Sequence, residues 1–298
     1  MTNKLNDIKM NCLKCSDINI RDPYVLFENG IYYMYGTRAK NFGINTGGFD
    51  VYVSKDLENW SEPVECFNSE TYNLNYASNW APEVHKYKDA YYMLATFTRE
   101  YNGLRATFIL KADNPFGPFM PHSKGAITPE DWECLDGTLY IDKNDVPYIV
   151  FCHEHTQIID GTICYMRLSD DLSENVGEAV TLFAASECPW VDNPGGYDYH
   201  FVTDGPFMYR TRDGELLMIW SSFINKQYAE LLVRFEDGEI GNKFEHLSPI
   251  IDDDGGHGMI FDDGEKLMFT YHSPNKKGFE RPAFVEIADN GDSVSVKR

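Results

Sequence analysis

The feature that most constrains the fold of this chain is a hairpin that recurs five times. Each copy has an apolar segment rich in aromatic residues, a polar turn and a second apolar segment. The copies are PYVLFENGIYYMYGT (23–37), PEVHKYKDAYYMLATF (82–97), GTLYIDKNDVPYIVF (137–151), GPFMYRTRDGELLMIWSS (205–222) and GMIFDDGEKLMFTYHS (258–273). Self-similarity at a spacing of this kind is typical of a repeat architecture.

A shorter segment follows each hairpin and has the pattern of a third strand that runs into an acidic turn. The five segments are VYVSKDLENW (51–60), FILKADNPFG (108–117), CYMRLSDDL (164–172), ELLVRFEDG (230–238) and FVEIADNG (284–291). Helical periodicity is almost absent, and a β-sandwich would not repeat one hairpin five times. The sequence therefore predicts an all-β fold, a five-bladed β-propeller with antiparallel blades around a central axis.

The five units follow one another without a linker rich in Pro, Gly or Ser. We therefore expect a single catalytic domain over residues 1–298. The N-terminal segment 1–18 precedes the first hairpin, and two interpretations stay open for it: it closes the ring of blades, or it is partly disordered.

Charge and hydropathy exclude several classes of partner. The chain has 47 acidic and 26 basic residues, a formal charge of −21, so a nucleic-acid backbone would be repelled. No apolar run is long enough for a membrane span, and the polar start from Met1 to Cys12 does not resemble a signal peptide. We expect a cytoplasmic protein.

Cys12 and Cys15 form a lone C-x-x-C without a second pair at zinc-site spacing, which argues against a metal or redox site there.

The innermost strands of a propeller line its channel, so the residues that begin the five hairpins should converge at the axis. These residues are Arg21-Asp22-Pro23, Trp80-Ala81-Pro82-Glu83, Leu135-Asp136-Gly137, Asp204-Gly205-Pro206 and Gly256-His257-Gly258. A single acidic residue before Gly or Pro is often only a turn former. Turn formation does not readily explain three carboxylates at matching places, because like charges gathered in a confined site repel one another. Asp22, Asp136 and Asp204 are therefore candidate catalytic residues.

The motifs RDPYV at Arg21, WAPEV at Trp80, LDGTLY at Leu135, DGPFMY at Asp204 and GGHGMIF at Gly255 resemble the blade motifs of glycoside hydrolase family 43. The resemblance extends over all five repeats. It implies a propeller that hydrolyses α-L-arabinofuranosidic or β-D-xylosidic bonds in plant-type oligosaccharides, with inversion at the anomeric carbon. By the family's motifs, Asp22 would be the general base, and Asp136 would orient the general acid and tune its pKa.

The general acid is the point at which this sequence departs from the family. The family usually has Glu before Gly-Pro, and this chain has Asp204. Aspartate is one methylene shorter, and a displacement of about 1 Å can lower a rate by about 100-fold. Glu154, in the run Phe151-Cys152-His153-Glu154-His155, is the alternative acid. It could instead bind substrate or form a structural hydrogen bond.

Three further residues are candidates for binding. Trp80 could stack on a sugar or pack in the core, and Glu83 could bind sugar hydroxyls or hold Trp80 in place. His257 resembles the family's axial histidine, which often reaches a calcium ion through water, although the chemistry itself needs no cofactor. The run Asp252-Asp253-Asp254 is expected to be a solvated turn rather than a set of ligands.

Three other functions stay open at this stage. The first is a sugar-binding propeller with impaired catalysis, and the second is a propeller for protein interaction. The third is a retaining hydrolase of similar fold. Its two carboxyl groups would lie about 5 to 5.5 Å apart, whereas an inverting enzyme separates them by about 6.5 to 9.5 Å to admit water.

Overall fold

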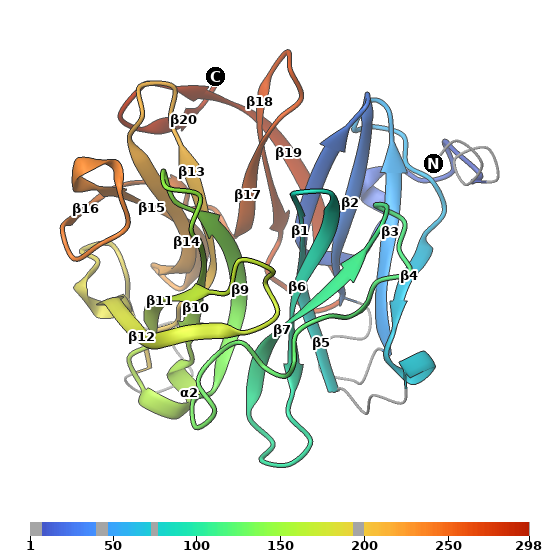
Figure 1. Cartoon of the computed structure of the whole chain (residues 1–298). Helices are drawn as coiled ribbons and strands as arrows, with labels where there is room; N and C mark the ends of the chain where they lie inside the picture. The colour runs from blue at the N-terminus through green and yellow to red at the C-terminus, as the bar shows by residue number, and fades with distance from the viewer. Residues whose placement is uncertain (1–7, 40–46, 73–76, 193–199, 298) are drawn as a thin grey trace.

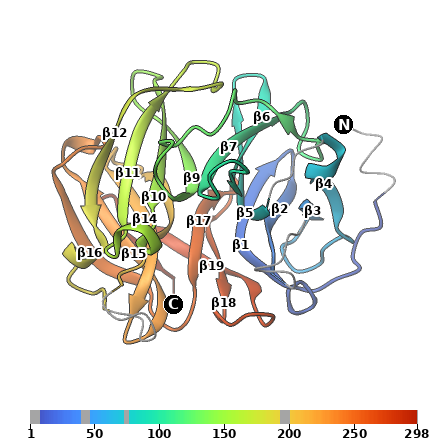
Figure 2. The same cartoon turned by 90° about the horizontal axis from the view of Figure 1, so that it is seen from below.

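The computed structural model describes residues 8–39, 47–72, 77–192 and 200–297. Five four-stranded antiparallel sheets stand around one axis, so the predicted five-bladed propeller is confirmed (Figure 1). Consecutive strands pair within each blade, and the first strand of each blade lies innermost. These inner strands, β1, β5, β9, β13 and β17, touch in sequence around the whole ring (Figure 2).

Blade 1 contains β1 (Ile20–Glu28), β2 (Ile31–Arg38), β3 (Gly48–Ser54) and β4 (Val64–Asn68). Blade 2 contains β5 (Ala77–Tyr87), β6 (Ala90–Thr98), β7 (Arg105–Ala112) and β8 (Met120–Pro121). Blade 3 contains β9 (Cys134–Ile141), β10 (Pro147–His153), β11 (Thr162–Leu168) and β12 (Asn175–Ala184). Blade 4 contains β13 (Asp204–Arg210), β14 (Leu216–Ile224), β15 (Gln227–Phe235) and β16 (Phe244–Ile251). Blade 5 contains β17 (Gly256–Asp262), β18 (Leu267–Ser273), β19 (Arg281–Asp289) and β20 (Val294–Val296).

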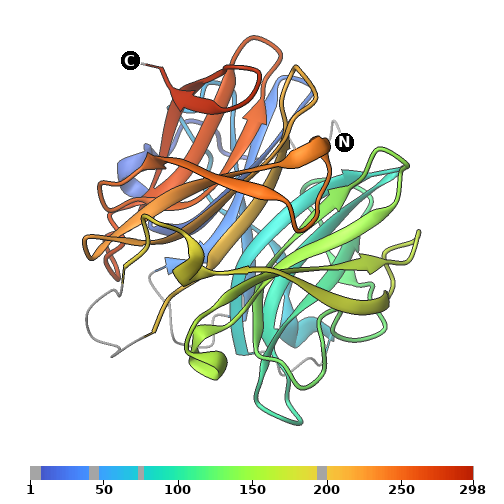
Figure 3. The same ribbon diagram turned by 90° about the vertical axis from the view of Figure 1, so that its left-hand side faces the viewer.

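The repeats found in the sequence coincide with these blades. Each hairpin forms the first two strands of a blade, and each acidic-turn segment overlaps the third. The outermost strands β12 and β16 cross the front of the view in Figure 3. The short helices within the described ranges are the 3₁₀ helices η1 (Cys15–Asp17), η3 (Ser69–Tyr72), η4 (Ala185–Glu187) and η5 (Glu236–Gly238), and the single turn α2 (His155–Ile158).

Aromatic side chains fill the spaces between adjacent blades. Phe97 of blade 2 lies 5.9 Å from Phe49 and 5.7 Å from Phe67 of blade 1, measured between ring centroids. Phe183 of blade 3 lies 5.2 Å from Trp220 of blade 4. All five rings are fully buried. Burial of large rings between sheets therefore explains why 14% of the chain is aromatic.

The inner strands share an irregularity near their first residues. In each blade the pairing register between the first two strands shifts, as in a β-bulge. One residue at each shift has a left-handed backbone, namely Asp22 (φ 54°), Ala81 (45°), Asp136 (54°), Gly205 (48°) and His257 (52°). For a residue with a side chain this conformation costs about 1–3 kcal/mol and persists only where neighbouring structure enforces it.

Hydrogen bonds between blades hold these left-handed residues. The N–H groups of four of them donate to a side chain on the second strand of the preceding blade. The pairs are Ala81 with Thr37 Oγ1 (2.7 Å), Asp136 with Thr96 Oγ1 (3.0 Å), His257 with Ser221 Oγ (2.6 Å) and Asp22 with His272 Nδ1 (3.2 Å). The fifth, the N–H of Gly205, donates instead to Asp136 Oδ2 at 3.2 Å. Neighbouring blades are thus joined at the residues that begin the inner strands.

The last blade meets the first without exchanging a strand. Asn19 Nδ2 donates to the carbonyl of Glu280 at 2.9 Å, and Arg281 Nε donates to the carbonyl of Ser16 at 2.7 Å. Leu13 pairs with Trp60 on blade 1. Within segment 1–18, residues 8–18 therefore lie along blade 1 and its seam with blade 5, and residues 1–7 lie outside the described ranges.

Two expectations about the rest of the chain concern cysteines and membranes. All seven cysteines are free, including Cys12 and Cys15. None of the helices in the described ranges is long and apolar enough to cross a bilayer.

The hydrogen bonds between blades give a first test. Thr96→Val keeps the side-chain shape but leaves the buried N–H of Asp136 without its acceptor, so the free energy of unfolding should fall by about 1–3 kcal/mol in a urea titration. The control is Thr107→Val in the same blade, because the buried Thr107 hydroxyl has no hydrogen-bond partner among the described residues. Equal losses from the two variants would contradict the role of these bonds.

Candidate active site

A cavity of about 450 Å³ lies where the inner strands begin, on the face turned toward the viewer in Figure 2. All five blades contribute to it. Its walls include Arg21, Asp22, Trp80, Arg105, Asp136, Glu154, His155, Asp204, Phe223, His257, Asn275 and Lys277. The structure therefore brings the three predicted catalytic carboxylates into one cavity.

Asp22 is buried and held on several sides. Its Oδ2 accepts a hydrogen bond from Thr37 Oγ1 at 2.6 Å, and its Oδ1 lies 3.2 Å from His257 Nδ1. Burial alone would raise the pKa of Asp22, but the positive charges of His257 and Arg21 lower it below its ordinary value. Asp22 is therefore ionised at neutral pH and can accept a proton from water.

Asp136 has the opposite shift. Its Oδ2 accepts the N–H of Gly205 and lies 3.8 Å from His257 Nδ1. Burial and the negative charges of Asp204 and Asp22 raise its pKa to about 8, although His257 opposes this. Two carboxyl groups with opposite shifts in one site are typical of acid/base catalysis.

His257 supplies positive charge between these carboxylates. Burial alone would lower its pKa, but Asp22, Asp136, Asp204 and Glu230 together raise it to about 9. The imidazolium offsets part of the repulsion that the carboxylates would otherwise have in a buried site.

Asp204, at the first residue of β13, belongs to the same cavity. Its Oδ2 accepts a hydrogen bond from the hydroxyl of Tyr228 at 3.0 Å. The next N–H along the chain, that of Gly205, is bound by Asp136. The carboxyl group of Asp136 thus holds the backbone that carries Asp204.

Glu154 and Trp80 lie together on another wall. Arg105 connects them: its Nη2 donates to Glu154 Oε2 at 2.6 Å, and its guanidinium lies 5.3 Å from the ring centroid of Trp80. His155 Nε2 is 3.4 Å from Glu154 Oε1. Burial raises the pKa of Glu154, while Arg105 and His155 act in the opposite direction.

Glu83 is the one predicted site residue that the structure does not bring to the cavity. Its carboxylate lies 2.9 Å from His85 Nε2. His85 in turn contacts Tyr24, whose ring packs against Phe207. Because Glu83 follows the left-handed Ala81 by two residues, it belongs to the next layer of the channel, and the predicted sugar contact is not supported.

The surroundings of His257 do not form a direct metal cage. Within the ranges that the structure describes, no three His, Cys, Asp or Glu side chains are placed to hold a metal ion. In the preceding acidic run, Asp252 and Asp253 are exposed, as expected for a solvated turn.

Glu230, which is fully buried behind His257, is not among the site residues predicted from the sequence. Its Oε2 accepts hydrogen bonds from Ser221 Oγ and from the N–H of Gly258, both at 3.0 Å. Burial raises its pKa to about 8. A signal did exist: Glu230 begins one of the five third-strand segments, whereas the other four begin with Val, Phe, Cys and Phe.

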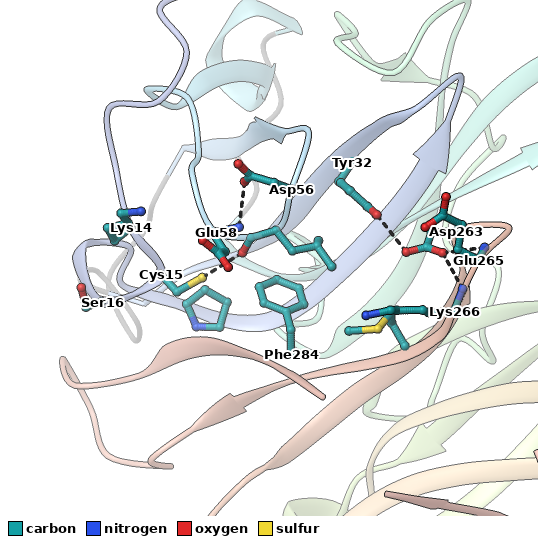
Figure 4. A pocket seen from close by; sticks show the side chains of 13 residues that line it. Lys14, Cys15, Ser16, Tyr32, Asp56, Glu58, Asp263, Glu265, Lys266 and Phe284 are labelled. Atoms are coloured by element: carbon teal, nitrogen blue, oxygen red, sulfur yellow. Dashed lines mark hydrogen bonds between the residues drawn. The ribbon is translucent and has the colours of Figure 1, made fainter. Parts of the chain in front are cut away.

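A larger groove of about 720 Å³ lies away from the axis, between blades 1 and 5 (Figure 4). Phe284 lies near its middle, with Asp56 and Asp263 on its walls. Asp56 accepts the N–H groups of Glu58 and Asn59, and Asp263 those of Glu265 and Lys266. These carboxylates cap their own turns, which makes them less suited to acid/base chemistry than the carboxyl groups of the smaller cavity.

Comparisons with known proteins identify the family of the chain. The sequence model of the family described as Glycosyl hydrolases family 43 matches residues 17–287. An endo-arabinase from Bacteroides thetaiotaomicron is 37% identical, with a TM-score of 0.83 over 93% of this chain and 96% of that chain. A thermostable family-43 glycoside hydrolase is 24% identical, with a TM-score of 0.79 over 94% and 93%. An endo-1,4-beta-xylanase from Bacteroides thetaiotaomicron is 24% identical, with a TM-score of 0.75 over 98% and 97%. No curated protein matches the chain.

Glu230 gives a prediction on pH dependence. Folding raises its pKa from 4.5 to about 8, so the stability it provides when protonated is lost as the pH rises through this interval. Glu230→Gln keeps the shape without the charge. Its melting temperature relative to wild type should therefore rise between about pH 5 and about pH 8.5. The exposed Glu178→Gln should show a constant difference, and so would Glu230→Gln if the carboxyl group were not buried as described.

Proposed function

The chain belongs to glycosyl hydrolases family 43 and is a glycoside hydrolase, and on this premise we propose that it cleaves α-L-arabinofuranosidic bonds in arabinan or arabino-oligosaccharides with inversion. The choice of arabinose is supported by the endo-arabinase that is 37% identical over 93% of the chain. The observation that carries the mechanism is the meeting of Asp22, Asp136 and Asp204 in one cavity at the axis.

Asp22 is the general base in this proposal. It removes a proton from a water molecule as the oxygen attacks the anomeric carbon. The low pKa of Asp22 keeps it ionised, and Thr37 and His257 hold its two oxygens. A base with fixed oxygens loses little orientational freedom when the water binds.

Asp204 is the general acid, which gives its proton to the leaving glycosidic oxygen. Asp136 acts as a positioning residue, because its Oδ2 accepts the N–H of Gly205 next to Asp204. Glu154 is less suited to donate a proton, because Arg105 and His155 already engage both of its oxygens, although burial raises its pKa. We assign Glu154 to substrate binding, with Trp80 as the sugar-stacking face.

Calcium near His257 stays a prediction. Calcium takes about six to eight oxygen ligands, and without a direct cage among the described side chains most of these would have to be water. No step of the mechanism runs through the ion. Calorimetric titration of chelator-treated protein with calcium tests the site, with His257→Gln as the control; absence of binding heat in the wild type contradicts it.

The substrate prediction can be checked with aryl pentosides and with arabino- and xylo-oligosaccharides. We expect hydrolysis of the arabinosides, and proton NMR of the first product should show the anomer opposite to that of the substrate. Hydrolysis of xylosides alone would show that the enzyme acts on xylosidic bonds, and the proposed arabinoside substrate would be wrong. Binding without turnover would indicate a sugar-binding propeller, and retention of configuration would contradict inversion.

The residue roles give a second prediction. Asp22→Asn should lower kcat by roughly 100- to 10,000-fold on every substrate while binding persists, because the variant keeps the shape of the base but not its basicity. Asp204→Asn should lower kcat strongly on oligosaccharides and weakly on an activated aryl glycoside, which needs little protonation. Glu154→Gln should lack this leaving-group dependence. If Glu154→Gln shows it and Asp204→Asn does not, Glu154 is the acid. The exposed Asp252→Asn serves as the control.

A further inference from the structure

Tyr228 is a buried residue next to the proposed acid. It lies on β15, is 1% exposed, and donates its hydroxyl hydrogen bond to Asp204 Oδ2 at 3.0 Å. It does not line the cavity, so a substrate would not touch it. Its contact is with one carboxylate oxygen of Asp204, which leaves Oδ1 as the oxygen that can carry a proton.

The ring of Tyr228 connects this contact to the proposed base. It stacks on the ring of His272, with centroids 5.5 Å apart and planes 24° apart. His272 Nδ1 accepts the N–H of Asp22 at 3.2 Å. His272 is fully buried and also lies outside the cavity lining. Two stacked rings therefore lie between Asp204 of blade 4 and Asp22 of blade 1.

Neighbouring groups pack closely against these rings. A Cβ atom at Gly256 would lie 2.7 Å from Tyr228 Cε1, so the backbone approaches the ring as closely as glycine allows. Phe223 contacts the same ring at 5.4 Å between centroids. Behind His272, Nε2 is 3.4 Å from Asn275 Oδ1.

We propose that Tyr228 and His272 are positioning residues that together form a spacer, which fixes the acid Asp204 and the base Asp22 relative to each other. This inference rests on the proposed function. An inverting enzyme needs a defined separation between its two carboxyl groups, and packed aromatic rings provide a stiffer spacer than flexible side chains.

The hydroxyl of Tyr228 also supports Asp204 through the chemical step. In the chemical step the Oδ1–H bond of Asp204 breaks, the proton passes to the glycosidic oxygen, and the bond from that oxygen to the anomeric carbon breaks. Asp204 is left as a carboxylate. The Tyr228 hydroxyl donates to that carboxylate throughout, so it holds the side chain in place and stabilises the charge that forms.

Tyr228→Phe tests the proposal, because it keeps the ring and removes one oxygen. We expect kcat on an arabino-disaccharide to fall about tenfold or more, with KM unchanged and with little loss on the 4-nitrophenyl arabinoside. The matched control is Tyr24→Phe, which removes a buried hydroxyl from the next layer of the channel. A merely structural tyrosine would give the same modest loss on both substrates, as we expect for Tyr24→Phe.

Two further variants complete the test. Tyr228→Phe combined with Asp204→Asn should be no slower than Asp204→Asn alone, because the hydroxyl acts through that carboxyl group. His272→Phe should lower kcat equally for good and poor leaving groups, because it displaces the base. His272→Gln, which can keep an acceptor for Asp22 but not the ring, replaces His272→Phe if that variant does not fold; an equal loss for both leaving groups is again expected.

The possible failures are distinguishable. If Asp204→Asn shows leaving-group dependence and Tyr228→Phe behaves like Tyr24→Phe, the spacer proposal fails and the proposed function survives. If Asp204→Asn itself lacks that dependence, the acid assignment fails, and the spacer proposal fails with it. Additive losses in the double variant, or full activity of the His272 variant, would also overturn the spacer.

Discussion

The structure depends most on how the five inner strands begin. At each beginning, one left-handed residue interrupts the strand, and its N–H group is bound by a side chain of a neighbouring blade. The same hydrogen bonds that join the blades therefore also fix the backbone of Asp22, Asp136 and His257. Assembly of the ring and preorganisation of the site are a single event, because neither the bulge nor its acceptor is complete within one blade.

The electrostatics of the cavity follow from this arrangement. Several carboxyl groups placed around one axis would repel one another strongly in a buried site. The imidazole of His257, directly beside Asp22 and Asp136, takes up a positive charge and balances part of the repulsion. As a result the two carboxyl groups differ: Asp22 has a lowered pKa and Asp136 a raised one. At neutral pH Asp22 can therefore accept a proton, whereas Asp136 retains one.

Each of three carboxyl groups in or behind the cavity is held by hydrogen bonds from neighbouring groups. Asp204 is oriented by Tyr228 and Glu154 by Arg105, and Glu230 is held by Ser221 and Gly258. The carboxyl group of Asp204 thus has its own supporting hydrogen bond from a buried side chain.

The sequence by itself determined the five blades, because repeated hairpins are a local pattern, and it identified Asp22, Asp136 and Asp204 because each stands at the same place in its repeat. Only the tertiary structure excluded Glu83 from the cavity, since a bulge decides which layer of the channel a side chain enters. The contact of Tyr228 could not be predicted from the sequence either, because its partner Asp204 lies 24 residues away on another strand. Contacts between strands and blades are set by register and packing, which no repeat in the sequence records.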